Sequence, residues 1–188
     1  MIVGIDFGAK LSGNTVICFL LKQNLHFIQF KKGENADSRI QQWIVENRPV
    51  EIGLDAPISL PSAYFGKGHD YMYRHADRLL NGMSPMFLGG LIARAMALKE
   101  FVEELGSHVI EVYPAAFVNK RYEDLAVLYK EDLGTCTRIL KDKFEYKLAE
   151  EPVNWHQFDA WVCWIITDMF RQGRHESAGF PEEGLIYY

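Results

Sequence analysis

Two aspartates lie in apolar, strand-like segments where an ionised side chain is costly. Asp6 lies within the segment Ile2–Phe7, and Asp55 ends the segment Ile52–Asp55. Each follows a glycine by two residues, so strand alternation puts a position without a side chain beside each carboxylate on the same face. On neighbouring strands about 4.8 Å apart, the two carboxylates would share one small hollow and repel each other by about 3 kcal/mol. A shared proton, an Arg or Lys, or a divalent cation would have to offset that repulsion.

A third aspartate lies in a C-terminal segment that is apolar around almost its whole circumference. The segment Trp155–Ile166 predicts a buried helix. This places Asp159 near the core, where ionisable groups are rare unless they are paired or bind a metal. His156 precedes Asp159 by three residues and shares its face of the first turns. Glu111 is a fourth acid in an apolar segment, His108–Tyr113.

Structural roles explain each of these residues equally well when it is considered alone. Asp6 could cap the turn that follows it, Asp55 could be an ordinary turn residue at a strand end, and Asp159 could pair with an arginine. His156 could simply begin a helix, and Glu111 could bond the backbone at the end of its strand. Taken together, the acids favour one shared functional site over several separate structural roles.

The elements that would position these residues follow from apolar periodicity and turn residues. Three strands with short links predict an antiparallel meander, and a crossover helix then leads to a fourth strand that should pair parallel to the first. Asn154 is expected to cap the last helix, with Gln157 in a capping-box-like position. The expected strands are 1–7, 14–21, 25–32, 50–55 and 108–113, and the clearest helices are 36–47, 91–105 and 155–171. The stretch over 56–107 is expected to be helical apart from loop signals at Pro57, Pro61, Gly66, Gly68 and Ser84-Pro85. This order predicts a single α/β domain with a mixed sheet.

Length and composition exclude several classes of protein. The chain has 188 residues, of which 48% are hydrophobic and 24% charged, values typical of one globular domain. No apolar run approaches the roughly 20 residues needed to cross a bilayer, so we expect no membrane partner. A net charge of −5 argues against a broad electropositive surface. Because the N-terminus has no basic leader and the three cysteines form no CxxC pair, we expect a cytoplasmic protein with reduced thiols.

Several short motifs follow one another in order along nearly the whole chain. They are Gly4–Gly8, Gly53–Pro61, Arg74-x-x-Asp77-Arg78, Glu111–Pro114, His156-x-x-Asp159-Ala160 and Glu182–Ile186. Together they resemble an uncharacterised family of predicted nucleases with a ribonuclease H-like fold, in the Holliday-junction-resolvase-like branch. The resemblance implies a mixed five-stranded sheet of order 3-2-1-4-5, flanked by helices, with strand 2 antiparallel to its neighbours. It also implies one domain over 1–188, with a helical insert at 62–107 between strands 4 and 5.

The resemblance further implies a magnesium or manganese site made by Asp6, Asp55 and Asp159, with Glu111 or His156 as a further member. The expected function is that of a metal-dependent nuclease that hydrolyses phosphodiester bonds of DNA or RNA by a two-metal mechanism, with these five residues as the catalytic set. Hard cations such as magnesium and manganese prefer carboxylate oxygens, and the same acids stand out from their apolar settings alone.

Nucleic acid is the expected partner, bound locally through the insert. Basic side chains interleaved with aromatic ones are typical of surfaces that hold phosphates and stack bases. The expected substrate-binding residues are Lys67, Arg74, Arg78 and Arg94, with His69 and Lys99 also basic and with the aromatic residues Tyr64, Phe65, Tyr71 and Tyr73. A solvated helix face whose basic residues pair with Asp70, Asp77 and Glu100 is the alternative.

Two other classes of function stay open on the sequence. A non-catalytic module that binds a nucleotide or a protein could use the same fold. Actin-like ATPases and sugar kinases share a Gly-x-Asp-x-Gly turn similar to Gly4–Gly8, but they duplicate the domain, and this chain has no second copy. The oligomeric state is left open, with a homodimer among the options.

Overall fold

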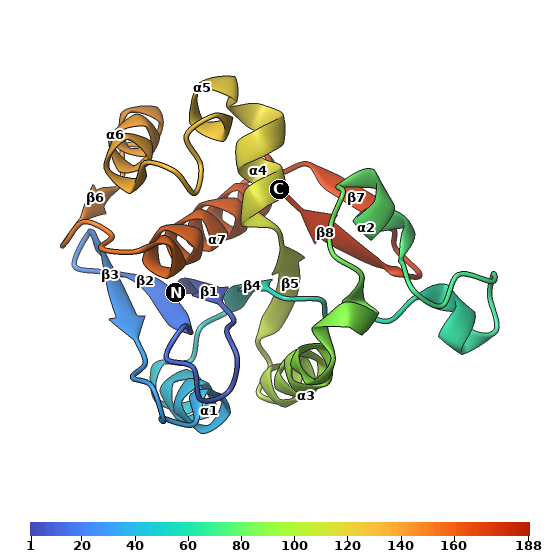
Figure 1. Ribbon diagram of the computed structural model, residues 1–188. Helices are drawn as coiled ribbons and strands as arrows, with labels where there is room; N and C mark the ends of the chain where they lie inside the picture. The colour runs from blue at the N-terminus through green and yellow to red at the C-terminus, as the bar shows by residue number, and fades with distance from the viewer.

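One mixed β-sheet between two layers of helices forms the framework of the protein (Figure 1). The computed structural model describes residues 1–188. The strands are β1 (Ile2–Asp6), β2 (Val16–Leu21), β3 (Asn24–Gln29), β4 (Glu51–Asp55), β5 (His108–Val112), β6 (Lys147–Leu148), β7 (Ser177–Phe180) and β8 (Gly184–Tyr187), in the order β6-β3-β2-β1-β4-β5-β8-β7. β2 is antiparallel to β1 and β3, whereas β1, β4 and β5 are mutually parallel. The predicted order 3-2-1-4-5 with an antiparallel second strand is therefore confirmed.

Three short strands extend the five expected ones to eight. β6 adds two residues beside β3, and the hairpin of β7 and β8 extends the other edge. β8 is parallel to β5 and pairs with it at only two positions, Glu111 with Ile186 and Val112 with Tyr187. The sequence predicted a loop and a short apolar end in this tail. Strands this short contain too few residues to show a period of two, so alternation could not reveal them.

Helices cover both faces of the sheet and enclose two apolar cores. On one face lie α4 (Pro114–Arg121), α5 (Glu123–Ala126), α6 (Leu133–Lys143) and α7 (Trp155–Arg171), and on the other lie α1 (Ala36–Asn47) and α3 (Gly90–Glu104) (Figure 1). The three clearest predicted helices correspond to α1, α3 and α7. None of the helices combines the length and apolar character needed to cross a bilayer.

The connection between β4 and α3 is less helical than the sequence predicted. It contains two short 3-10 helices, Ser62–Phe65 and Pro85–Leu88, and the short helix α2 (His75–Leu79). Gly66 and Gly68 have φ values of 75° and 78°, a left-handed conformation that ends a helical turn. The expectation of a largely helical stretch over 56–107 is therefore wrong before α3.

The predicted cap of α7 is present and holds the start of the helix that carries Asp159. The Asn154 side chain accepts a hydrogen bond from the Gln157 backbone N–H at 3.0 Å. The Gln157 side chain in turn accepts one from the Val153 N–H at 3.0 Å, one residue earlier than in a standard capping box. Two N–H groups at the helix start are thereby satisfied, which sets where α7 begins.

The two glycines that precede the aspartates allow α7 to lie directly against the sheet. A Cβ on Gly4 would lie 2.2 Å from the Trp164 backbone nitrogen and 2.5 Å from the Ala160 carbonyl oxygen. A Cβ on Gly53 would lie 2.0 Å from the Thr167 hydroxyl oxygen. The sequence suggested an open hollow beside the carboxylates. In the structure, α7 fills the side-chain-free positions at Gly4 and Gly53.

We expect Gly4→Ala to destabilise the protein strongly, because the added methyl group meets backbone atoms that cannot rotate away. Overpacked cores typically lose about 1 to 3 kcal/mol, and a displaced α7 would also move Asp159. Chemical denaturation of the metal-free protein measures the effect. Gly90→Ala is the matched control, since a Cβ there meets nothing within 4 Å. Equal stability of the two variants would contradict the close approach of α7.

Candidate active site

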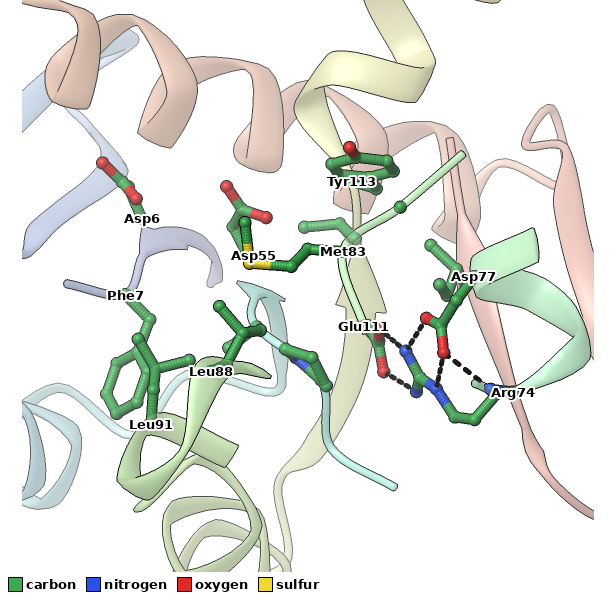
Figure 2. Close-up of a pocket in the computed structure, with 15 residues that line it drawn as sticks. Asp6, Phe7, Asp55, Arg74, Asp77, Met83, Leu88, Leu91, Glu111 and Tyr113 are labelled. Carbon is green, nitrogen blue, oxygen red and sulfur yellow. Dashed lines mark hydrogen bonds and ion pairs between the residues drawn. The ribbon is translucent and has the colours of Figure 1, made fainter. Parts of the chain in front are cut away.

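Asp6 and Asp55 end neighbouring parallel strands at the same level of the sheet. β1 and β4 pair Gly4 with Gly53 and Asp6 with Asp55, and both carboxylates line one pocket (Figure 2). Burial, and then the charges of Asp6 and Asp159, raise the pKa of Asp55 well above its ordinary value. Burial also raises the pKa of Asp6. Asp55 makes no hydrogen bond with the protein that would hold its charge, so it is the member of the pair without a direct partner.

Asp159 reaches the same group of acids from α7, but two other side chains already hold its carboxylate. The Tyr129 hydroxyl donates to Oδ1 at 2.6 Å, and the Lys130 ammonium forms an ion pair with Oδ2. The ammonium lies 4.8 Å from the Tyr129 ring centre and 5.4 Å from that of Trp155, distances typical of cation–π contacts. Lys130 has a φ of 70°, which is costly for a residue other than glycine. Neither Tyr129 nor Lys130 was predicted as a site residue from the sequence, and no local motif marks them.

His156 contacts the first of the acids. Its Nδ1 lies 2.7 Å from Asp6 Oδ2, so the predicted proximity of His156 to the acids is present in the structure. The hydrogen bond to Asp6 raises the pKa of His156 and opposes the effect of its partial burial. The imidazole therefore keeps its proton to higher pH than a free histidine, next to a carboxylate that favours the charged form.

Lys130 partly neutralises all three aspartates, since its charge lowers the pKa values of Asp6, Asp55 and Asp159 against the effect of their burial. We expect Lys130→Met to lower the melting temperature of the metal-free protein at pH 7. The pKa values of the folded-state acids would rise further above the unfolded value of 3.8, so the loss should be present at neutral pH and shrink as the acids become protonated.

The same Lys130→Met variant should bind manganese more tightly, because a competing cation has been removed. Thermal melting with and without manganese, from about pH 4 to about pH 8, measures both effects. This range spans the ordinary pKa values of aspartate and histidine. Lys120→Met is the matched control, as Lys120 is an exposed lysine on α4. A pH-independent loss of stability would show that Lys130 acts by packing and not by its charge.

Glu111 belongs to a buried ion cluster with Arg74 and Asp77. Arg74 binds both Glu111 carboxylate oxygens at 2.6 Å, and its Nε and Nη2 donate to the two oxygens of Asp77 at 3.1 and 2.6 Å. The side chains of Arg74, Asp77 and Glu111 are 1%, 2% and 5% exposed. The ion pairs and hydrogen bonds with Glu111 and Asp77 raise the pKa of Arg74 even though its burial acts in the opposite direction. Glu111 thus fixes the insert to β5, whereas the sequence placed it among the catalytic acids.

Arg74 has no N–H group left for a substrate. Its fifth donor reaches the Ser59 hydroxyl at 2.8 Å, so all five guanidinium N–H groups are used. The expectation that Arg74 binds a phosphate is therefore not supported by its position. The spacing Arg74-x-x-Asp77, with opposite charges three residues apart at the start of a helix, is the signal that could have indicated this internal pairing.

Glu183 makes a second attachment of the insert. Its carboxylate accepts hydrogen bonds from the backbone N–H groups of Ser62, at 2.8 Å, and His75, at 2.7 Å. Burial of Glu183 raises its pKa, but these hydrogen bonds outweigh that effect and hold the pKa below its usual range. The segment that precedes β8 therefore holds both the first short helix of the insert and the start of α2, a role that the sequence did not assign.

The other predicted substrate-binding residues differ in how accessible they are. Arg94 pairs with Asp37 at 2.7 Å and donates to the Gly8 carbonyl at 3.1 Å, so it supports the turn after β1. Arg78 is exposed and pairs with Asp70, as the structural alternative proposed. Lys67 is exposed. Of the four basic residues, Lys67 and Arg78 lie where a nucleic acid could reach them.

The pocket beside the acids has a volume of about 360 Å³. Figure 2 shows Asp6 and Asp55 toward one side of it, and the Arg74 cluster toward the other. Its remaining walls are mainly apolar, from residues that include Phe7, Pro57, Met83, Leu88, Leu91 and Tyr113. The site thus combines two neighbouring carboxyl groups, of which Asp55 has no direct partner, with an apolar cavity.

The donor chemistry of these residues fits a hard divalent cation. Asp6 and Asp55 supply carboxylate oxygens on adjacent strands, and Asp55 has no cationic or hydrogen-bonding partner of its own. Magnesium and manganese prefer such oxygen ligands. No three His, Cys, Asp or Glu side chains are already grouped closely enough to surround an ion, and Asp159 is held by Lys130. Asp6 and Asp55 are therefore the residues that fit a cation as they stand.

No protein-family model and no curated protein matches the chain. Among solved structures, it is similar to T. thermophilus RuvC in complex with Holliday junction substrate, at 14% sequence identity and a TM-score of 0.49. The match covers 92% of this chain and 96% of that chain. The fold class is visible in the sheet itself: a mixed α/β protein whose central strand order and antiparallel β2 are those expected of a ribonuclease H-like fold.

Proposed function

We propose that this protein is a metal-dependent hydrolase that cleaves phosphodiester bonds of a nucleic acid. The observation that carries the proposal is Asp55, a carboxylate in register beside Asp6 with a raised pKa and no partner in the protein. Such a pair is costly for folding, and a bound cation would offset that cost. A structural ion pair with Arg74 accounts for the buried carboxylate of Glu111. No such ion pair is formed by Asp55.

Asp6 and Asp55 would hold the cation, with Asp159 joining them if Lys130 releases it. When bound, magnesium or manganese would polarise the phosphodiester and make an attacking water more acidic. The two-ion form of the mechanism requires Asp159 as well as the other two acids. Because the Lys130 ion pair competes for that carboxylate, displacement of Lys130 is part of the two-ion form of the proposal.

His156 would hold a proton next to Asp6. Its Nδ1 bonds to Asp6, which leaves Nε2 without a partner in the protein. A histidine with a raised pKa in this place can position a water molecule or give a proton to a leaving oxygen. Glu111 has no such role in the proposal, because Arg74 occupies both of its oxygens.

The exposed part of the insert would contact the nucleic acid. Lys67 and Arg78 supply positive charge, and Phe65 and Tyr71 are 64% and 54% exposed. Exposed aromatic rings next to cations can stack bases and hold the strand by its phosphates. In a chain with a net charge of −5, this contact would be local.

The test is cleavage of a panel of single-stranded, duplex and branched DNA, RNA and hybrid substrates with magnesium or manganese. We expect the wild-type protein to cleave at least one substrate and Asp6→Asn to lose about 100-fold or more in rate, or about 2.7 kcal/mol of transition-state stabilisation. The double variant Lys67→Glu with Arg78→Glu should weaken binding and flatten its salt dependence while metal binding is unchanged.

Asp142→Asn is the control for this panel, because Asp142 is exposed on α6 and makes no ion pair. A metal-dependent cleavage rate that is the same in wild type and Asp6→Asn would reject the proposed site. Metal-dependent binding without cleavage of any substrate would instead support the non-catalytic binding module.

A further inference from the structure

We propose that the apolar pocket beside Asp55 binds one unpaired nucleobase of the substrate strand. The inference rests on the proposed function and deepens it, because it assigns the substrate class. A phosphodiester at Asp6 and Asp55 has a nucleoside on each side, and the apolar cavity that opens next to these acids is within the same pocket. This apolar surface cannot bind the charged phosphate itself, so it is available to a neutral part of the nucleotide.

The charges around the pocket exclude an anionic occupant. Asp6 and Asp55 at one side supply carboxyl oxygens and no cationic group, and at the other side every N–H of Arg74 is already bonded to Asp77, Glu111 or Ser59. A free phosphate or carboxylate would therefore find no donor in the Arg74 cluster. The occupant must be neutral, and it must reach the pocket from a group held at the carboxylates.

The size and lining of the pocket fit a flat ring. A volume of about 360 Å³ is near the lower end of small-molecule sites, roughly 300 to 1,000 Å³, so the pocket can take a base and its sugar. Tyr113 gives an aromatic wall, and its hydroxyl makes no hydrogen bond within the protein, so it can bond to a base edge. Met83, 61% exposed, lines the same pocket with a flexible thioether.

A base can enter this pocket only if it is not paired in a helix. Extruding a base from a duplex costs pairing and stacking, and the cost is smallest for a base that is already single-stranded or mismatched. Single-stranded or splayed strands should therefore bind more tightly than a fully paired duplex of the same sequence, by roughly tenfold or more.

The experiment uses a set of short single-stranded oligonucleotides, each with one 2-aminopurine at a different position. They are bound to the full chain in calcium, and gel analysis checks that they stay intact. We expect one position at which the bound probe is protected from quenching by acrylamide, relative to its neighbours. Met83→Trp, which fills the pocket from an exposed position, should remove this protection and weaken binding about tenfold. Met72→Trp is the matched control, because Met72 is an exposed methionine of the insert outside the pocket.

The outcomes separate this inference from the proposed function. Equal quenching at every position, or protection that survives in Met83→Trp, overturns the base pocket, and cleavage of the substrate panel would then still support the proposed function. Tighter binding of a fully paired duplex than of the single strand also overturns the base pocket. If no oligonucleotide binds in any divalent cation, both the base pocket and the proposed function are rejected.

Discussion

Asp55→Asn is expected to raise the melting temperature of the metal-free protein at pH 7 and to abolish its stabilisation by manganese. Two charges about 5 Å apart at an effective dielectric near 20 repel by about 3 kcal/mol, which sets the upper limit of the gain. The asparagine keeps the shape of the side chain and removes its charge, so Asp6 and Asp159 lose a like-charged neighbour. Manganese stabilises only a folded state that binds it, and the variant lacks the ligand with no other partner.

The pH dependence gives the sign of this effect. The pKa of Asp55 is raised in the folded protein, so the folded state binds more protons than the unfolded state just above the ordinary value of 3.8. The contribution of Asp55 to wild-type stability is therefore fully present below that value and is lost as pH rises through the raised pKa. The advantage of Asp55→Asn should be full at pH 7 and vanish in acid. Thermal melting across this range, with Asp142→Asn as the control, measures it. A wild-type-like manganese shift in Asp55→Asn would reject the metal site.

Arg74→Met is expected to destabilise the protein by about 3 to 5 kcal/mol, because it leaves two buried carboxylates without a cation. Asp77 and Glu111, whose side chains are 2% and 5% exposed, would lose the cation that offsets their negative charges. The insert would lose its attachment to β5, and the pocket would lose one wall. Urea denaturation measures the free energy of unfolding.

Arg78→Met is the control for the buried cluster. It also breaks an ion pair, that with Asp70, but there the side chains are 59% and 38% exposed, and exposed pairs contribute about 0 to 1 kcal/mol. A triple variant, Arg74→Met with Asp77→Leu and Glu111→Met, should recover much of the loss, since no buried charge is left unpaired. A small effect of Arg74→Met alone would show that the cluster does not hold the insert.

The sequence alone was sufficient for the elements whose pattern is local. α1 begins and ends at the predicted residues, and the Asn154 cap marks the start of α7. The parallel pairing of β1 with β4 follows from the single crossover helix between them, and it brings Asp6 beside Asp55. Periods of 3.6 and 2 record which face of an element is buried, so these features can be predicted from the chain itself.

Only the tertiary structure decided which side chains pair with each acid. Asp159 meets Tyr129 and Lys130, which precede it by 30 and 29 residues, and Glu111 meets Arg74 across 37 residues. In the sequence, Arg74 and Arg78 are two basic residues of one motif, yet one is buried and the other exposed. The pattern of residue types is the same for a phosphate-binding arginine and for an internal one.

The glycines before the two aspartates show the physical reason for this limit. Alternation correctly placed a position without a side chain next to each carboxylate, but it could not show that α7 fills the space at Gly4 and Gly53. A local sequence pattern shows where a glycine leaves space for want of a side chain. The atoms that occupy this space come from a segment that is distant in the sequence. The packing of α7, and not the pattern Gly-x-Asp, is what places Asp159 near Asp6 and Asp55.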